Sequence, residues 1–114
     1  MTDFAPTDAE RMVKQLAHDF ALKEIRPVAK EYDEREEFPW ELMKKAAALG
    51  LTGRPITGEG APDGITQMLI AEEMGWGCGG VALSVMVNTL NATFINLIGR
   101  PEQRARWIDR KSVV

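Results

Sequence analysis

One segment constrains the fold more than any other, because residues 81–98 predict a helix that is apolar on two sides. One stripe at helical spacing comprises Leu83, Met86, Val87, Leu90, Phe94 and Leu97. A second stripe, on the opposite side, comprises Val81, Val85, Ala92 and Ile95, with small polar side chains between the two. A helix that is apolar on two sides is usually buried on two sides. We therefore expect this helix to be central and to be the most buried element.

The N-terminal third predicts a long helix over residues 7–35. Thr7 and Glu10 have the spacing of a capping box at its start. Pro27 lacks a backbone donor and crowds the preceding turn, so it is expected to kink this helix or to divide it into two consecutive helices.

Three shorter helices are predicted after it. Pro39 opens a helix over 39–49, and Gly50 ends it. Asp63 is a plausible N-cap for a helix over 65–74. A basic helix over 101–110 is expected to turn Trp107 and Ile108 inward. The intervening stretches read as breaks: a glycine- and proline-rich loop over 50–64, and a second break at Gly75, Gly77, Gly79 and Gly80.

These elements predict one all-α domain with a bundle-like arrangement of four to five helices and no substantial sheet. The chain has 114 residues, of which 45% are hydrophobic and 27% charged, an ordinary globular composition. Its net charge of −3 gives no global electrostatic footprint for nucleic acid. No membrane span is expected, because no run of 18 apolar residues is present.

Cysteine and histidine are scarce. Cys78 is the single cysteine and His18 the single histidine, so neither an internal disulfide nor a Cys- or His-rich metal site is predicted. The first residues lack the basic start and apolar stretch of a secretory signal, so a cytoplasmic location is expected. His18 lies off the apolar stripe and is expected to be an exposed helix residue.

Two carboxylates are placed unusually. Glu24 and Glu72 each fall near the centre of an apolar stripe, where a carboxylate needs a partner. One reading is a general base; the favoured one is a structural ion pair, with Arg54 as the candidate partner. We expect both carboxylates to be at least half-buried. Separately, Leu83, Met86, Val87 and Leu90 have the spacing to line an acyl-sized cavity, although spacing alone favours a core role.

Several motifs in order resemble the N-terminal helical domain of an acyl-CoA dehydrogenase. They are E-I-x-P at 24–27, F-P-x-E-L at 38–42, an aspartate nine residues before E-E at 72–73, L-S-V-x-x-N at 83–88, and G-x-x-E-Q-R-x-R at 99–106. Each motif is weak alone, but together they cover almost the whole chain at near-family spacing.

The resemblance implies oxidation of an acyl-CoA thioester to its trans-2-enoyl form, with FAD as hydride acceptor and an electron-transferring flavoprotein as electron partner. It implies that helix 81–98 forms one wall of the acyl pocket through Ala82, Leu83, Met86, Val87 and Leu90. In the family, the catalytic glutamate and most flavin contacts lie in later domains. We therefore assign no catalytic residue to this chain and expect it alone to be inactive, without bound FAD, and prone to form homo-oligomers.

Three readings stay open at this point. The chain is either part of such an enzyme or a stand-alone helical module that pairs with a protein partner through its apolar helix. A family relative with other chemistry, such as an acyl-CoA oxidase or a flavin monooxygenase, is the third reading. The base and the flavin environment distinguish these chemistries, and neither is expected in this chain.

Overall fold

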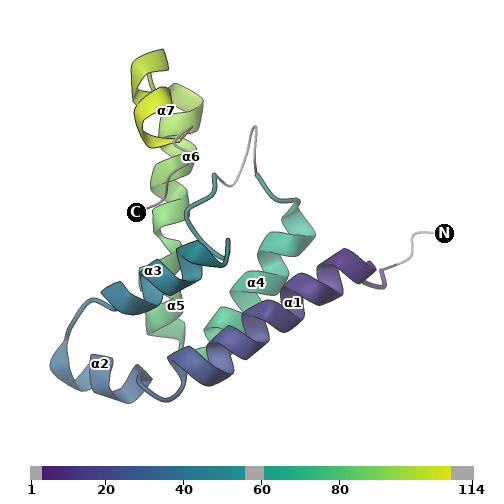
Figure 1. Ribbon diagram of the computed structural model, residues 1–114, viewed down its shortest axis with the longest axis vertical. Coiled ribbons are helices and arrows are strands. Elements are labelled where there is room, and N and C mark those ends of the chain that lie inside the picture. Colours follow the sequence, from purple (N-terminus) through teal and green to yellow (C-terminus); the bar gives the residue numbers. More distant parts are fainter. Residues whose placement is uncertain (1–3, 56–60, 109–114) are drawn as a thin grey trace.

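The computed structural model describes residues 4–55 and 61–108, and these form an all-α domain (Figure 1). Within them no strand is present, which confirms the predicted fold class. The elements are α1 (Asp8–Phe20), the π-helical turn η1 (Ala21–Ile25), α2 (Ala29–Arg35), α3 (Trp40–Ala48), α4 (Gly64–Gly77), α5 (Gly79–Met86), α6 (Asn88–Ile98) and α7 (Pro101–Trp107).

The first helix begins and ends for identifiable reasons. The Glu10 N–H donates to the Thr7 hydroxyl at 3.2 Å, and the Thr7 N–H donates to the Glu10 carboxylate at 2.7 Å, which completes the capping box. At its other end α1 widens into η1, and the chain turns at Pro27 before α2 begins. The N-terminal segment is thus two consecutive helices joined by a π-helical turn, one of the two arrangements expected.

The core is built where α1, η1 and α4 cross, with α3 and α5 closing it. Its fully buried large side chains are Ile25, Met74 and Val85. Gly77 allows the closest approach, since a Cβ there would lie only 3.0 Å from the Cβ of Ala21. Smaller or flanking side chains complete the cluster: Ala17, Phe20, Ala21, Leu42, Ala46, Leu51, Ile70, Val81 and Ala82.

The predicted glycine break is wrong at all four of its glycines, because Gly79 and Gly80 are the first two residues of α5. Gly75 and Gly77 lie inside α4, which continues to Gly77 instead of ending at residue 74. The break is confined to Cys78, whose extended backbone (φ −171°, ψ 122°) separates α4 from α5. Glycine is a poor helix former, but here its missing side chain permits the close crossing with η1.

The expectation that helix 81–98 is the most buried element is also wrong. Its N-terminal half, α5, supplies core side chains, but α6 buries only Ala92. In Figure 1, α6 and α7 extend away from the crossing of α1 and α4. Helix α7 does not turn Trp107 inward, because that side chain is 58% exposed. Residues 109 and 110 of the predicted basic helix lie outside the described part of the chain.

Candidate functional site

The main candidate site is the open apolar face of α5 and α6, which we call the apolar strip. It consists of Leu83, Val87, Leu90, Phe94 and Leu97, which are between 45% and 71% exposed. These side chains follow one another at intervals of four, three, four and three residues, so they form one line along the helix axis. The other side of the same segment is the one that packs into the core.

The five predicted wall residues do not share one environment. Leu83, Val87 and Leu90 lie together on the apolar strip. Ala82 is only 6% exposed and belongs to the core. Met86 is half-buried and lines a groove on a different flank of the helix. The structure therefore leaves three of the five open to a ligand or a partner on this strip.

A local irregularity lies between α5 and α6. The helix is interrupted at Val87, and three threonine hydroxyls donate to helix carbonyls around it. Thr52 donates to Val85 at 2.9 Å, Thr89 to Met86 at 2.6 Å, and Thr93 to Thr89 at 2.8 Å. Such side-chain bonds compete with the helical ladder and often bend it. The strip thus crosses from the packed α5 to the projecting α6.

The groove beside Met86 lies between α4 and the segment that follows α3. Its volume is about 440 Å³, and its lining includes Leu51, Thr52, Arg54, Met68 and Thr89. Arg54 is exposed at this groove and forms no ion pair with a described carboxylate. The predicted pairing of Arg54 with Glu24 or Glu72 is therefore wrong.

The two predicted buried carboxylates have different outcomes. The Glu24 carboxylate is partly buried and accepts from the Lys45 ammonium at 2.8 Å. The hydrogen bond and charge of Glu24 raise the pKa of Lys45. Glu72, by contrast, has an exposed side chain, so its expected burial is wrong. Its neighbour Glu73 is the buried carboxylate on α4, at 8% exposure.

Glu73 has partners that the sequence pattern did not predict. Its carboxylate lies 2.7 Å from Nδ1 of His18 and 3.8 Å from Nζ of Lys14. The His18 ring stacks on Trp76 at 4.6 Å, and Arg26 lies 4.4 Å from the centroid of a Trp76 ring. His18 is therefore not a free surface residue, and this cluster ties α1 to α4. The contacts within this cluster indicate that it stabilises the packing of the two helices.

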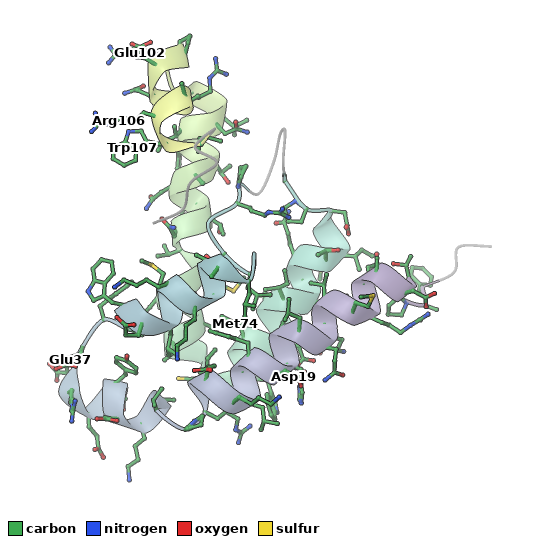
Figure 2. The ribbon with its side chains drawn as sticks, viewed as in Figure 1. Asp19, Glu37, Met74, Glu102, Arg106 and Trp107 are labelled. Atoms are coloured by element: carbon green, nitrogen blue, oxygen red, sulfur yellow. The ribbon has the colours of Figure 1, made fainter. Side chains whose placement is uncertain are left out.

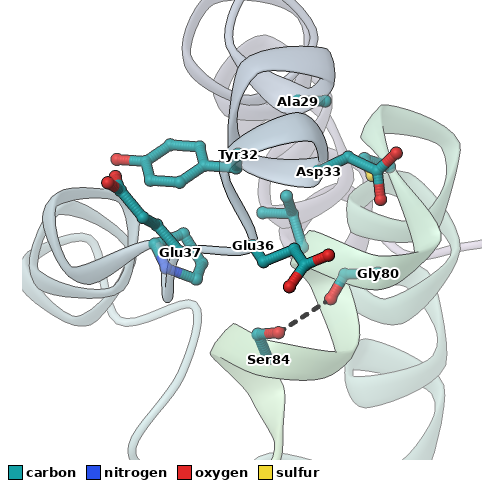
Figure 3. A pocket seen from close by; sticks show the side chains of 10 residues that line it. Ala29, Tyr32, Asp33, Glu36, Glu37, Gly80 and Ser84 are labelled. Carbon is teal, nitrogen blue, oxygen red and sulfur yellow. Dashed lines mark hydrogen bonds between the residues drawn. The ribbon is translucent and has the colours of Figure 1, made fainter.

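An acidic pocket lies at the N-terminal end of α5 (Figure 3). The carboxylates of Asp33, Glu36 and Glu37 surround it, with Gly80 and Ser84 of α5 on the other side. Its volume is about 240 Å³. None of these three carboxylates forms an ion pair with another described residue, and no metal-ligand cluster is present in the part of the chain that the structure describes.

The described residues do not fit a flavin site. A dinucleotide needs converging backbone or cationic donors for its pyrophosphate and an apolar slot for its ring. The groove beside Met86 offers one cation, Arg54, and otherwise mostly apolar side chains. The start of α4 at Gly64 lines this groove, but the start of α5 at Gly79 does not. No step of a reaction is therefore assigned to flavin bound by these residues.

Length and composition alone would also permit a membrane span over Gly79–Ile98. The same test is passed by core helices of soluble proteins. Val81 and Val85 of this segment are buried in the core, where α5 packs against α3 and α4, so composition does not establish a span here.

The chain is thus an all-helical domain in which one long segment, α5 and α6, packs on one side and is open on the other. The sequence profile of the acyl-CoA dehydrogenase N-terminal domain matches residues 7–111. The chain therefore belongs to the acyl-CoA dehydrogenase family, as its N-terminal domain.

Curated relatives agree with this assignment. The chain is 38% identical over 111 residues to the short-chain specific acyl-CoA dehydrogenase of Clostridium acetobutylicum, covering 93% of this chain and 29% of that protein. It is 37% identical to the Bacillus subtilis protein named "Probable acyl-CoA dehydrogenase YngJ", covering 90% and 28%. It is 36% identical to the acryloyl-CoA reductase (NADH) of Anaerotignum propionicum, covering 95% and 28%. The chain thus spans less than a third of the length of these relatives.

Proposed function

We propose that this domain contributes one wall of the acyl-binding pocket in an enzyme that oxidises an acyl-CoA thioester between its α and β carbons. The observation that carries the proposal is the exposed apolar strip. The described helices of this domain leave it uncovered, so it is accessible to an acyl chain. Leu83, Val87 and Leu90 are the side chains best placed to contact an acyl chain. An apolar wall binds such a chain by removing both surfaces from water.

The reaction chemistry is proposed to reside elsewhere. In the dehydrogenation an α-proton passes to a base and a β-hydride to an acceptor, which is FAD in the family. The described residues form no flavin site, and no carboxylate lies on the apolar strip. We therefore propose that this domain binds and orients the acyl chain and excludes water. An electron-transferring flavoprotein is the proposed electron partner of the whole enzyme.

A second reaction direction has one specific observation in its favour. A relative of similar identity is named acryloyl-CoA reductase (NADH), which acts in the sense of reduction. The pocket wall proposed here is compatible with either direction, because it contacts the acyl chain and supplies neither proton nor hydride.

A domain graft tests the proposal. Residues 7–108 replace the corresponding segment of the Clostridium acetobutylicum relative, and acyl-CoA-dependent dye reduction is measured across acyl chain lengths. We expect the graft to retain flavin and activity. We expect Leu90→Ala to shift its preference towards longer chains by about tenfold, the usual effect of one to two methylene groups in an apolar pocket.

The matched control is Met12→Ala, because Met12 is also a large, exposed apolar residue but lies on α1. Its chain-length profile should equal that of the unmodified graft. A graft that retains flavin and activity, but whose profile does not change with Leu90→Ala, would contradict the proposed wall.

A further inference from the structure

The segment that follows α3 is fixed by a complete helix-ending motif. The Gly50 N–H donates to the Ala47 carbonyl at 3.0 Å, and the Leu51 N–H donates to the Ala46 carbonyl at 2.9 Å. With the positive φ of Gly50, these two hydrogen bonds form a Schellman motif. Leu51 is only 4% exposed and belongs to the core. The residue that follows it therefore starts from a fixed place beside the core.

That residue is Thr52, whose buried side chain reaches across to α5. Thr52 is 4% exposed, and its hydroxyl donates at 2.9 Å to the carbonyl of Val85, 33 residues further along the chain. In a continuous helix the Val85 carbonyl would accept from the N–H of residue 89. Val85 is fully buried, where a carbonyl without a donor is costly. Thr52 therefore gives this carbonyl a donor at the point where the helix is interrupted.

The Val85 carbonyl lies at the junction between the two halves of the proposed acyl wall. Helices α5 and α6 meet at Val87, which belongs to neither. Just beyond it the Leu90 N–H donates to the Val87 carbonyl at 3.0 Å, a tighter turn than that of an α-helix. Leu83 lies before this junction and Leu90 after it. The position of one relative to the other therefore depends on the geometry of the junction.

The segment after α3 lies beside both sides of the junction. Thr52 contacts the end of α5, and a Cβ at Gly53 would lie 3.8 Å from Nδ2 of Asn88, the first residue of α6. Figure 2 shows what the junction connects, because Met74 lies in the packed core and Trp107 of α7 lies at the far end of the molecule. This segment is therefore placed to hold the two helices in one relative position.

We propose that Thr52 is a positioning residue for the acyl wall. Its hydroxyl fixes the junction between α5 and α6, and it thereby sets how sharply the enzyme distinguishes acyl chains of different length. Thr52 does not lie on the apolar strip, so it acts through the backbone of α5. A wall that its supporting residues hold firmly discriminates better than one that adjusts to each chain. The inference rests on the proposed function, in which Leu83 and Leu90 contact the acyl chain.

A purely structural role for Thr52 predicts a different result. If its hydroxyl did no more than stabilise the fold, its loss would lower the amount of folded enzyme equally for every substrate. The ratio of kcat/KM between two acyl chain lengths would then stay the same, because both values come from the same sample. A positioning role changes that ratio, so the ratio is the quantity to measure.

The test uses the domain graft described above and compares its preferred acyl-CoA with a poorly used one. Thr52→Val removes the hydroxyl and nearly keeps the shape of the side chain. We expect it to reduce the kcat/KM ratio about three- to tenfold, the usual worth of one hydrogen bond. Thr52→Ser keeps the hydroxyl and should keep the ratio. Ser84→Ala is the matched control, because it removes a hydroxyl that donates to the Gly80 carbonyl within α5 itself, and it should leave the ratio unchanged.

A double-mutant cycle tests whether Thr52 acts through Leu90. Once Leu90→Ala has removed the side chain that is positioned, adding Thr52→Val should change the ratio by less than about twofold further. Bound flavin shows that each graft is folded. If the Thr52→Val graft loses its flavin, Thr52→Cys takes its place, since a thiol is of similar size but donates weakly. Its ratio should then lie clearly below that of Thr52→Ser.

The outcomes separate this inference from the proposed function. If Leu90→Ala changes the chain-length profile but Thr52→Val does not change the ratio, the positioning role is overturned and the acyl wall stands. Equal losses in Thr52→Val and Thr52→Ser also overturn it, because the hydroxyl would not be the cause. So do fully additive effects in the cycle with Leu90→Ala. A profile that Leu90→Ala leaves unchanged contradicts the acyl wall itself, and the positioning role falls with it.

Discussion

At the residue scale, burial on α4 differs from its prediction by one position. Glu73 is buried, and the adjacent Glu72 is exposed. Helix α4 carries apolar side chains around much of its circumference, among them Ile65, Met68 and Ile70. The centre of an apolar stripe is therefore poorly defined by spacing, and adjacent positions differ by about 100° around the helix. The sequence could predict a buried carboxylate here, but not which of the two.

The partners of Glu73 predict a specific loss of stability. Glu73→Gln removes the carboxylate charge that faces His18 and Lys14 at a site largely shielded from solvent. We expect a cost of about 1–3 kcal/mol in the free energy of unfolding, measured by urea titration at fixed protein concentration. Glu72→Gln is the neighbouring control and should change stability by less than about 0.5 kcal/mol. Equal effects of the two variants would show that Glu73 has no special role.

The cap of α4 predicts a pH dependence. The Thr66 N–H and hydroxyl donate to the Asp63 carboxylate at 2.9 and 2.7 Å, and these hydrogen bonds lower the pKa of Asp63 from 3.8. The ionised Asp63 carboxylate stabilises the fold in full at pH values above its ordinary pKa of 3.8. This stabilisation is lost as the pH falls through the lower pKa that Asp63 has in the folded state.

The melting temperatures of the wild type and Asp63→Ala measure this effect. The wild type should be the more stable at pH 6, and the difference should shrink as the pH falls below about 4. A difference that grows on acidification would contradict the assignment of Asp63 as an ionised cap.

At the element scale, the glycines show how far a sequence pattern can predict an ending. Gly50 was correctly predicted to end α3, and its φ of +75° is one that glycine adopts without strain. Gly77 was predicted as a break but lies within α4, where it contacts η1. Whether a glycine ends a helix or permits a close crossing depends on a segment some fifty residues away. That information is tertiary and does not appear in local spacing.

The crossing of α4 with η1 predicts opposite outcomes for two glycines. A Cβ at Gly77 would lie 3.0 Å from Ala21 and 3.2 Å from Ile25, both fully buried. Gly77→Ala should therefore destabilise the chain by about 1–3 kcal/mol, despite alanine's better helix propensity. A Cβ at Gly75 meets nothing within 4 Å, so Gly75→Ala should be neutral or gain up to about 1 kcal/mol. Thermal unfolding distinguishes the two, and a stabilised Gly77→Ala would rule out the tight crossing.

At the scale of the whole molecule, the helical spacing of apolar residues predicted the all-α class, and the order of motifs in the sequence indicated the family. The two apolar sides of helix 81–98 were also visible there. The sequence did not show which of the two sides is covered, because spacing defines a face of a helix but does not say what packs on it. Val85 and Leu83 are both apolar, yet Val85 is fully buried and Leu83 is 71% exposed.

The absence of a flavin site among the described residues predicts a colourless protein. The purified 114-residue chain should show no flavin absorbance after incubation with FAD and desalting, and no acyl-CoA-dependent dye reduction. The graft described above serves as the positive control in the same assay. Stoichiometric flavin retained by the chain alone would show a site that the described geometry does not account for.

The central claim is that the open face of α5 and α6 contacts the acyl chain, and ligand protection of a thiol tests it directly. In the graft, Leu90→Cys is alkylated with and without a saturating acyl-CoA, and mass spectrometry follows the peptide that contains residue 90. A cysteine at Met12 is the control. We predict that the acyl-CoA slows alkylation at residue 90 at least several-fold and leaves residue 12 unchanged. Equal alkylation at residue 90 with and without acyl-CoA, in a graft that turns over the substrate, would contradict the claim.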